Sequence, residues 1–295
     1  MIMKTRKDFL FYCRIPVWLF MLLIVTFPMI YSLTTSFRKY SFALPGYDGQ
    51  FVGLSNYIRA LSDPQFWSSM GVTLIILIVA IPLQLIIGFF LAAMLNRGLK
   101  GTKIFTSMIL LPMTIAPIVV GLIGRLLLMD RFGVISYYLE HFGILENFTI
   151  LSTPASAIIA IIIIDVWHWT PFIMIILLAG LKALPSEPYE AIQIDGGNKL
   201  QATFYLTLPL MKPIVLTAAM LRGMDLFRIF DEILVLTGGG PGISSQSLEL
   251  FTYQVSFHNW DMGYGASIGM ISFFILLIAS MFIQRLIQNN AEVNG

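Results

Sequence analysis

The chain has 295 residues, of which 57% are apolar and only 12% are charged, and its mean hydropathy is +0.83. This charged fraction is about half that of an ordinary soluble domain, so the composition excludes a soluble globular protein. A net charge of +2 gives no indication of a nucleic-acid surface, and the single cysteine, Cys13, excludes an internal disulfide framework. The composition predicts an all-α integral membrane protein.

Six apolar segments have about the length that a helix needs to cross the hydrocarbon core of a bilayer. They cover residues 15–37, 70–95, 104–128, 155–180, 213–236 and 266–284. The first segment is too long for the core of a signal peptide and lacks a small-residue cleavage site, so we count it as a helix. We therefore expect one transmembrane domain over 1–295.

Lys and Arg residues predict the orientation of these six spans. Eleven of the eighteen lie before the first span, in the second and fourth loops, or after the last span. Because basic residues gather on the cytoplasmic side, we expect both termini to be cytoplasmic. Pro82, Pro112, Pro117 and Pro171 lie inside spans and predict broken helices, whose freed carbonyl groups need partners from other helices or from water.

The sequence lacks the motifs that accompany covalent chemistry. No G-x-x-x-x-G-K-[ST] loop is present to hold a nucleotide, and the three histidines form no H-E-x-x-H motif. We therefore expect no catalytic residues, no metal site and no cofactor in this chain.

The fourth loop, at 186–209, contains the polar stretch EAIQIDGGNKL. Ser186 is suited to cap a helix that ends near Ile194, because Gly196 and Gly197 permit a left-handed turn. A second helix is expected from Asn198 to just before Pro209, with an apolar stripe that comprises Leu200, Phe204 and Leu208. The pattern predicts an exposed helix–turn–helix on the cytoplasmic side.

This loop resembles the E-A-A-x-x-D-G…I-x-L-P loop of binding-protein-dependent ABC importer permeases. The matching residues are Glu190, Ala191, Asp195, Gly196, Leu206, Leu208 and Pro209. Ile192 and Gly197 depart from the alanine that is common in the family. FVGLSNYIRALSDPQFW (51–67) and RGMDLFRIFDEILVLTGGGPG (222–242) are similar to segments of the sugar branch, in particular of its maltose-type first permease.

The resemblance implies a six-span importer permease that supplies half of a translocation pathway for a sugar or oligosaccharide. It implies a second homologous permease, two ATPase subunits that bind ATP and Mg²⁺, and an extracytoplasmic solute-binding protein as partners, in a bacterial or archaeal plasma membrane. The coupling loop would dock into a groove on the ATPase. Its contact and turn residues would be Glu190, Ala191, Asp195, Gly196, Gly197 and Pro209.

Charged residues in the fifth span indicate a polar pathway, because charge at membrane depth must face protein or water. Arg222, Asp225 and Arg228 follow at i,i+3, and Arg228 precedes Glu232 by four positions, so one helix face can hold an alternating ladder. Aromatic and polar residues of the fourth span lie at similar depth. The substrate-pathway candidates are His168, Trp169, Phe172, Arg222, Asp225, Arg228 and Ile229. Structural pairing between helices remains the alternative role for each of them.

The two arginines, Arg222 and Arg228, also suggest an acidic substrate as a weaker hypothesis. The outer loop formed by Gly238, Gly239, Gly240 and Pro241 either contacts the solute-binding protein or only gives flexibility to a helix end. Two other function classes remain open. A secondary transporter would use Asp165, His168 and Asp225 as a proton site, and a membrane-embedded enzyme lacks a recognisable nucleophile.

Overall fold

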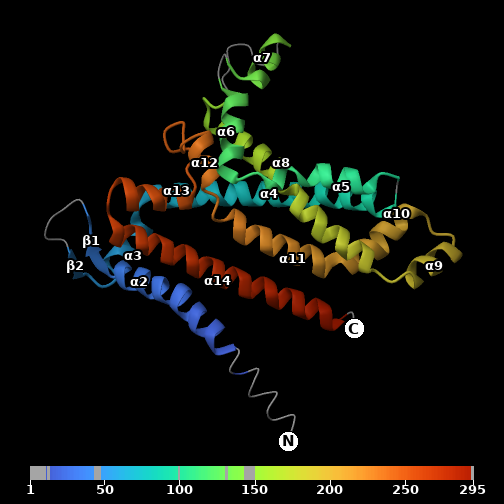
Figure 1. Cartoon of the computed structure of the whole chain (residues 1–295), viewed down its shortest axis with the longest axis horizontal. Coiled ribbons are helices and arrows are strands. Elements are labelled where there is room, and N and C mark those ends of the chain that lie inside the picture. Colours follow the sequence, from blue (N-terminus) through green and yellow to red (C-terminus); the bar gives the residue numbers. More distant parts are fainter. Residues whose placement is uncertain are drawn as a thin grey trace, which may run out of the picture. The chain divides into compact units, whose positions relative to one another are not determined.

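The computed structural model describes residues 11, 14–42, 48–98, 100–129, 132–142 and 150–293. Nearly all of this backbone is helical, and its only described sheet is a two-stranded hairpin (Figure 1). Five helices in the described part are long and apolar enough to cross a membrane. They are Arg14–Ser36, Pro64–Asn96, Pro154–Ala183, Lys199–Leu226 and Met262–Gln288. The basic residues Lys4, Arg6 and Lys7, on which the orientation partly depends, lie outside the described residues.

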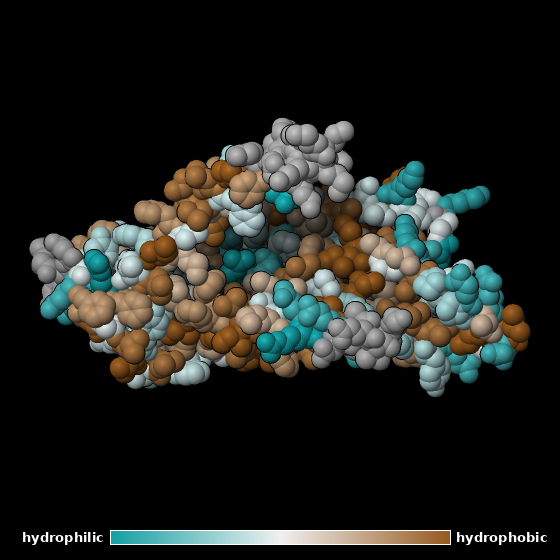
Figure 2. Space-filling view, turned by 90° about the horizontal axis from the view of Figure 1, so that it is seen from below, coloured by the Kyte–Doolittle hydropathy of each residue, from teal (hydrophilic) through white to brown (hydrophobic). Residues whose placement is uncertain are grey.

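The chain divides into two compact units. Unit 1 comprises Met1–Asp63 and Thr252–Ile275, and unit 2 comprises Pro64–Phe251 and Leu276–Gly295. Brown, apolar side chains cover much of the face that Figure 2 shows, as expected for helices that contact lipid.

Unit 1 contains the first span, the hairpin and the beginning of the last span. Its elements are η1 (Leu22–Thr26), α2 (Phe27–Ser36), β1 (Arg38–Tyr40), β2 (Asp48–Phe51), α3 (Ser55–Ser62), η4 (Gln254–His258) and the first part of α14 (Met262–Val293). The amide of Asn56 donates to the carbonyl groups of Ser36 and Arg38, both at 2.9 Å. The Arg59 guanidinium is 2.7 Å from the Asp261 carboxylate. These polar contacts hold the hairpin, α3 and the start of α14 together.

Unit 2 contains the remaining helices. They are α4 (Pro64–Asn96), α5 (Thr102–Leu110), η2 (Pro112–Thr114), α6 (Pro117–Leu128), α7 (Val134–His141), α8 (Pro154–Ala183), α9 (Glu187–Ile194), α10 (Lys199–Ala202), η3 (Thr203–Thr207), α11 (Leu208–Leu226) and α12 (Asp231–Leu236), with α13 (Leu248–Tyr253) at its boundary. The long helices α4 and α8 pack against each other along much of their length. A Cβ at Gly88 would lie 2.9 Å from the Ile173 side chain, so glycine permits this close approach. Their apolar core continues onto α11 through Met211 and Ala218.

Two predicted spans are not continuous helices. The predicted span at 104–128 is divided into α5, η2 and α6, because Pro112 and Pro117 lack the N–H groups that an unbroken helix needs. The predicted span at 213–236 is interrupted after Leu226, and α12 begins only at Asp231. Pro82 and Pro171 lie inside the continuous helices α4 and α8, so the prediction of a break at these two prolines was wrong.

Candidate functional site

The interruption of the fifth predicted span leaves an unwound segment at 227–230. Its Ile229 carbonyl accepts a hydrogen bond from the Ser247 hydroxyl at 2.7 Å. Ser247 is fully buried, as is Ser245, and Gln246 between them is 1% exposed. The Leu248 N–H donates to the Thr73 hydroxyl of α4 at 2.9 Å. A buried polar segment at 245–247 therefore holds the unwound segment in place.

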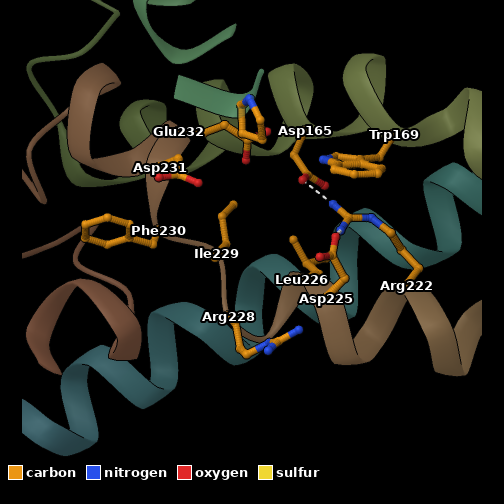
Figure 3. A pocket seen from close by; sticks show the side chains of 11 residues that line it. Asp165, Trp169, Arg222, Asp225, Leu226, Arg228, Ile229, Phe230, Asp231 and Glu232 are labelled. Atoms are coloured by element: carbon orange, nitrogen blue, oxygen red, sulfur yellow. Dashed lines mark hydrogen bonds and ion pairs between the residues drawn. The ribbon is translucent and has the colours of Figure 1, made fainter. Parts of the chain in front are cut away.

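A small cavity of about 70 Å³ lies beside this segment. Its lining combines the start of α6 with α8, α11, the unwound segment and α12, the last four of which carry the side chains labelled in Figure 3. The lining residues are Pro117, Asp165, Trp169, Arg222, Asp225, Leu226, Arg228, Ile229, Phe230, Asp231 and Glu232. Five of the seven predicted pathway residues line it, and His168 and Phe172 do not.

The Arg222 guanidinium is the centre of a buried polar network. It is ion-paired with Asp165 of α8 and with Asp225 one turn further along α11. Its Nε donates to Oε1 of Gln84 on α4 at 3.2 Å, and the Gln84 amide donates to Asp165 Oδ2 at 2.8 Å. The Trp169 ring faces the guanidinium at 4.9 Å from the ring centroid. In Figure 3 Arg222 points into the cavity wall toward Asp165 and Trp169. Three helices are thereby joined around one cation.

Of the alternating ion pairs expected on one helix face, the described residues form only the pair of Arg222 with Asp225. Arg222 pairs with Asp225, but Arg228 lies beyond the end of α11 and Glu232 belongs to α12. Glu232 binds His168 instead, with 2.8 Å between its Oε1 and Nδ1 of the imidazole. A continuous helix was expected because the predicted span reaches Leu236. The helix is interrupted at 227–230, where the Ile229 carbonyl accepts a hydrogen bond from Ser247 and not from its own helix.

His168 is buried away from the cavity. Its second ring nitrogen, Nε2, is 3.1 Å from the carbonyl oxygen of Ile115, in the interruption between η2 and α6. Phe172 packs against Trp169 with perpendicular rings 6.2 Å apart. The roles of Gln84 and Ile115 could not be predicted, because a lone glutamine and a carbonyl group in apolar segments carry no sequence signal for a partner.

The loop at 186–209 forms two helical segments joined by a tight turn, as predicted. Gly196 has a φ of +77°, which glycine adopts without strain. Asn198 and Gln201 form a reciprocal capping box, whereas Ser186 makes no side-chain cap. The second segment does not end before Pro209, because α10 continues through η3 into α11. In Figure 1 this loop lies at the opposite end of α8 and α11 from α6 and α12.

The side chains on this loop are largely exposed. Glu190, Ala191, Asp195 and Gly196 are exposed, and Gly197 is partly buried against Ile192. Large apolar side chains also face outward, with Ile194 86% and Tyr205 74% exposed. Ile194 ends α9 and Tyr205 lies in η3, so the loop exposes apolar side chains beside its carboxylates.

The glycine-rich loop at 238–241 is held by hydrogen bonds. The Ser245 hydroxyl donates to the Gly240 carbonyl at 2.6 Å, and its oxygen lies 2.8 Å from Thr237 Oγ1, within hydrogen-bonding distance. Gly238 and Gly239 both have positive φ angles, of 63° and 90°. Gly238 is exposed and Pro241 is partly exposed, so the turn presents a defined surface.

Comparisons with known proteins place the chain in a transport family. Residues 84–292 match the family model of the binding-protein-dependent transport system inner membrane component. A probable ABC transporter permease protein of Sinorhizobium fredii is 38% identical over 99% of this chain and 94% of its own length. The trehalose/maltose transport system permease protein MalF of Thermococcus litoralis is 36% identical over 93% of this chain and 92% of its own length.

Solved structures share the fold. A chain of a bacterial alginate ABC transporter, solved in complex with an alginate pentasaccharide-bound periplasmic protein, superposes with a TM-score of 0.80 and 19% identity. The match covers 96% of this chain and 95% of that one. A chain of the MetNI methionine ABC transporter covers 78% of this chain with a TM-score of 0.56. The resemblance noted from the sequence motifs is confirmed, and the chain belongs to the family of binding-protein-dependent transport system inner membrane components.

Proposed function

We propose that this chain is one of two permease subunits of an ATP-driven, binding-protein-dependent sugar importer and forms half of its pathway. The observation that carries the proposal is the exposed helix pair at 186–209, which continues directly into α11 and so into the cavity wall. Because α10, η3 and α11 follow one another without a gap, a movement of this loop would also move Arg222 on α11. The chain itself would have no catalytic activity.

The partner at the loop would be an ATPase subunit. Glu190 and Asp195 offer exposed carboxylates, and the apolar side chains of Ile194 and Tyr205 are suited to a groove on another protein. Approach of two such subunits on binding ATP and Mg²⁺ would displace the loops of both permeases. A second homologous permease and an extracytoplasmic solute-binding protein would complete the transporter, and the outer turn at 238–241 is the candidate contact for the latter.

The cargo would be a carbohydrate. An indole ring beside carboxylate and guanidinium groups suits a sugar, because the ring covers apolar C–H groups while polar groups bind hydroxyls. The relatives named for trehalose and maltose support this class. The cavity of about 70 Å³ is smaller than the roughly 300–1,000 Å³ of typical small-molecule sites. The pathway would therefore open to sugar size only with the second permease and after movement.

Arg222 gives little support to an acidic cargo, because two carboxylates already bind its guanidinium. The carboxylates on the cavity wall, at Asp165, Asp225, Asp231 and Glu232, outnumber its two arginines. We therefore propose a neutral sugar or oligosaccharide.

The proposed topology has six membrane crossings with both termini cytoplasmic. The third crossing would be made by α5 and α6 together, and the fifth by α11 and α12 together, each interrupted near the middle. Irregular backbone at membrane depth is tolerated where it is buried in protein or lines a cavity, and the segment at 227–230 meets this condition. The loop at 186–209 would then be cytoplasmic, in the plasma membrane of a bacterium or archaeon.

The experiment that tests this function is uptake of labelled disaccharides, including trehalose and maltose, by cells with and without the gene. We expect gene-dependent uptake that continues when an uncoupler dissipates the proton gradient and stops when ATP is depleted. Uptake that stops with the uncoupler while ATP is maintained would support the secondary transporter that uses Asp165, His168 and Asp225.

A further inference from the structure

Three consecutive polar residues, Ser245, Gln246 and Ser247, form a buried return segment that follows the turn at 238–241. Ser245 and Ser247 are fully buried, and Gln246 is 1% exposed. A buried polar side chain costs free energy unless it is hydrogen-bonded, so the partners of these three residues show what the return segment holds. Each of the three bonds to a different part of unit 2.

Ser245 faces the turn. Its hydroxyl donates to the Gly240 carbonyl at 2.6 Å, and its backbone N–H donates to the Gly239 carbonyl at 3.0 Å. The turn itself reaches the surface, because Gly238 and Gly242 are exposed. Two hydrogen bonds to adjoining carbonyl groups therefore join a surface turn to the buried return segment.

Ser247 faces the unwound segment at 227–230. Its hydroxyl donates to the Ile229 carbonyl at 2.7 Å and accepts from the Leu250 N–H at 3.2 Å. The single proton of the hydroxyl and one of its lone pairs are both in use, which fixes the orientation of the side chain. Because Ile229 lines the cavity, Ser247 holds part of the cavity wall.

Gln246 and Leu248 fix the return segment to α4. The Gln65 amide donates to Gln246 Oε1 at 2.9 Å, and the Ser69 hydroxyl donates to the same oxygen at 3.1 Å. The Leu248 N–H donates to the Thr73 hydroxyl at 2.9 Å. The three α4 residues follow one another at i,i+4 and so lie on one helix face. Contacts over two helical turns define both the position and the direction of the return segment.

These contacts close a ring in the chain. The backbone runs from the unwound segment through α12 to the turn, and the return segment leads from the turn back to Ile229. The turn and the cavity wall are thus connected twice, once through the six residues of α12 and once through the return segment. Two connections restrain relative movement more than one, so the turn and the cavity wall should move together.

We propose that Ser245 and Ser247 are positioning residues that transmit a displacement of the turn at 238–241 to the cavity wall at Ile229. The proposal rests on the function proposed above, in which a solute-binding protein contacts this turn. Neither serine lines the cavity, so both act through the backbone that they bind and not by contact with cargo. Energetic coupling between two sites typically changes an equilibrium constant by about 5–150-fold.

The first test measures how accessible the cavity wall is to a thiol reagent. The chain is purified with the proteins that remain bound to it, with Cys13→Ser to remove its only cysteine and Ile229→Cys as the reporter. The substitution retains the backbone carbonyl that Ser247 binds. A second reporter, Ala92→Cys, is placed in the core of α4, α8 and α11, about 28 Å further along α4 than Thr73. Rates of labelling by N-ethylmaleimide are compared at one pH.

The rate at residue 229 divided by the rate at residue 92 measures local opening at the cavity wall. We expect Ser245→Ala, which alters the turn end of the return segment, to raise this ratio by about fivefold or more. The double variant Ser245→Ala, Ser247→Ala should raise the ratio no further than the larger single variant does. Both substitutions remove the same connection, so their effects should not add.

Ser244→Ala is the matched control, because the Ser244 hydroxyl donates to the Pro241 carbonyl within the loop. It should leave the ratio unchanged to within about twofold. An unchanged ratio in Ser245→Ala would overturn the proposal even if Ser247→Ala failed to fold. Equal rises at both reporters would also overturn it, because the return segment would then stabilise the whole fold without joining the turn to the cavity.

The second test is uptake of labelled trehalose and maltose by cells, expressed per amount of chain in the membrane. Ser247→Ala leaves the exposed surface of the turn unaltered, so docking of a partner there should be preserved. We expect the maximal rate to fall about fivefold or more, while the half-saturating concentration stays within about twofold. A raised half-saturating concentration at an unchanged maximal rate would overturn the proposal. Absence of an ATPase from every preparation would contradict the proposed function instead, and the labelling ratio would still decide whether the turn and the cavity wall are joined.

Discussion

Arg222 on α11 and Asp165 on α8 are 57 residues apart in the chain, and they form an ion pair in which each side chain is only 1% exposed. Removing one partner of a buried pair leaves an uncompensated charge, which costs far more than the intact pair contributes. The pair therefore joins α8 and α11 in a way that single substitutions should reveal.

We expect Arg222→Leu to lower the free energy of unfolding by about 3–5 kcal/mol, because Asp165 then remains buried without its cation. The double variant Arg222→Leu, Asp165→Leu should recover most of this loss. Unfolding of the purified chain in detergent measures both. Arg285→Gln is the control, since Arg285 is exposed on α14, and it should change stability by less than about 0.5 kcal/mol. Equal losses for Arg222→Leu and Arg285→Gln would contradict the described network.

The Ser247 hydroxyl should stabilise the unwound segment. Ser247→Ala removes the donor to the Ile229 carbonyl and should cost about 1–3 kcal/mol, because a buried acceptor loses its partner. Ser244→Ala is the matched control, since the Ser244 hydroxyl bonds only within its own turn, to Pro241. The free energies of unfolding of both variants are measured in detergent. An unchanged value for Ser247→Ala would contradict the stabilising role of its hydroxyl.

The contact between α6 and α12 can be tested at Gly121. Gly121→Ala places a methyl group against the Glu232 backbone and should destabilise by about 1–3 kcal/mol through overpacking. Gly71→Ala on α4 meets no atom within 4 Å and should instead be neutral or stabilising, by up to about 1 kcal/mol. If both alanine variants had the same stability, the close approach of the two helices would be refuted.

Glu249 on α13 should make stability depend on pH. Burial raises the pKa of its carboxyl group above the ordinary value, and the positive charge of Arg228 partly opposes this shift. The folded state therefore binds more protons than the unfolded state between the two pKa values, so this contribution to stability is present at acidic pH and is lost as pH rises. Glu249→Gln should remove the dependence and raise stability at neutral pH. Unfolding measured across pH with both proteins checks the sign, and a steeper slope in the variant would contradict it.

The sequence was sufficient to predict the membrane spans that are continuous helices and the shape of the loop at 186–209. Long apolar runs and glycine turns are local signals, and Gly196 adopts the positive φ that its position in the turn requires. The interruption of the third predicted span was predicted from Pro112 and Pro117, whereas the interruption of the fifth span has no such local signal. At Ile229 the backbone leaves the helix although residues 227–230 contain neither proline nor glycine, and the partner of its carbonyl is Ser247, eighteen residues later.

The same limit applies to the polar network. The i,i+3 spacing of Arg222 and Asp225 was informative because both residues lie on one helix. The pairing of His168 with Glu232 could not be predicted, because it depends on α12 beginning anew at Asp231. Residues placed on one face by a continuous helix are thus predictable, and residues that meet across a break are not.

The central claim is that the exposed loop at 186–209 couples this permease to an ATPase. The most direct measurement is a gentle detergent purification of the chain from its native membrane, with bound proteins identified by mass spectrometry. Wild type is compared with Glu190→Arg, Asp195→Arg and with a control that reverses two exposed charges in the second loop and its helix, Arg97→Glu, Lys103→Glu. We predict that an ATPase and a second permease accompany wild type and the control, and that only the ATPase is lost from the loop variant. Retention of the ATPase by the loop variant, or a chain that purifies alone in all three forms, would contradict the account.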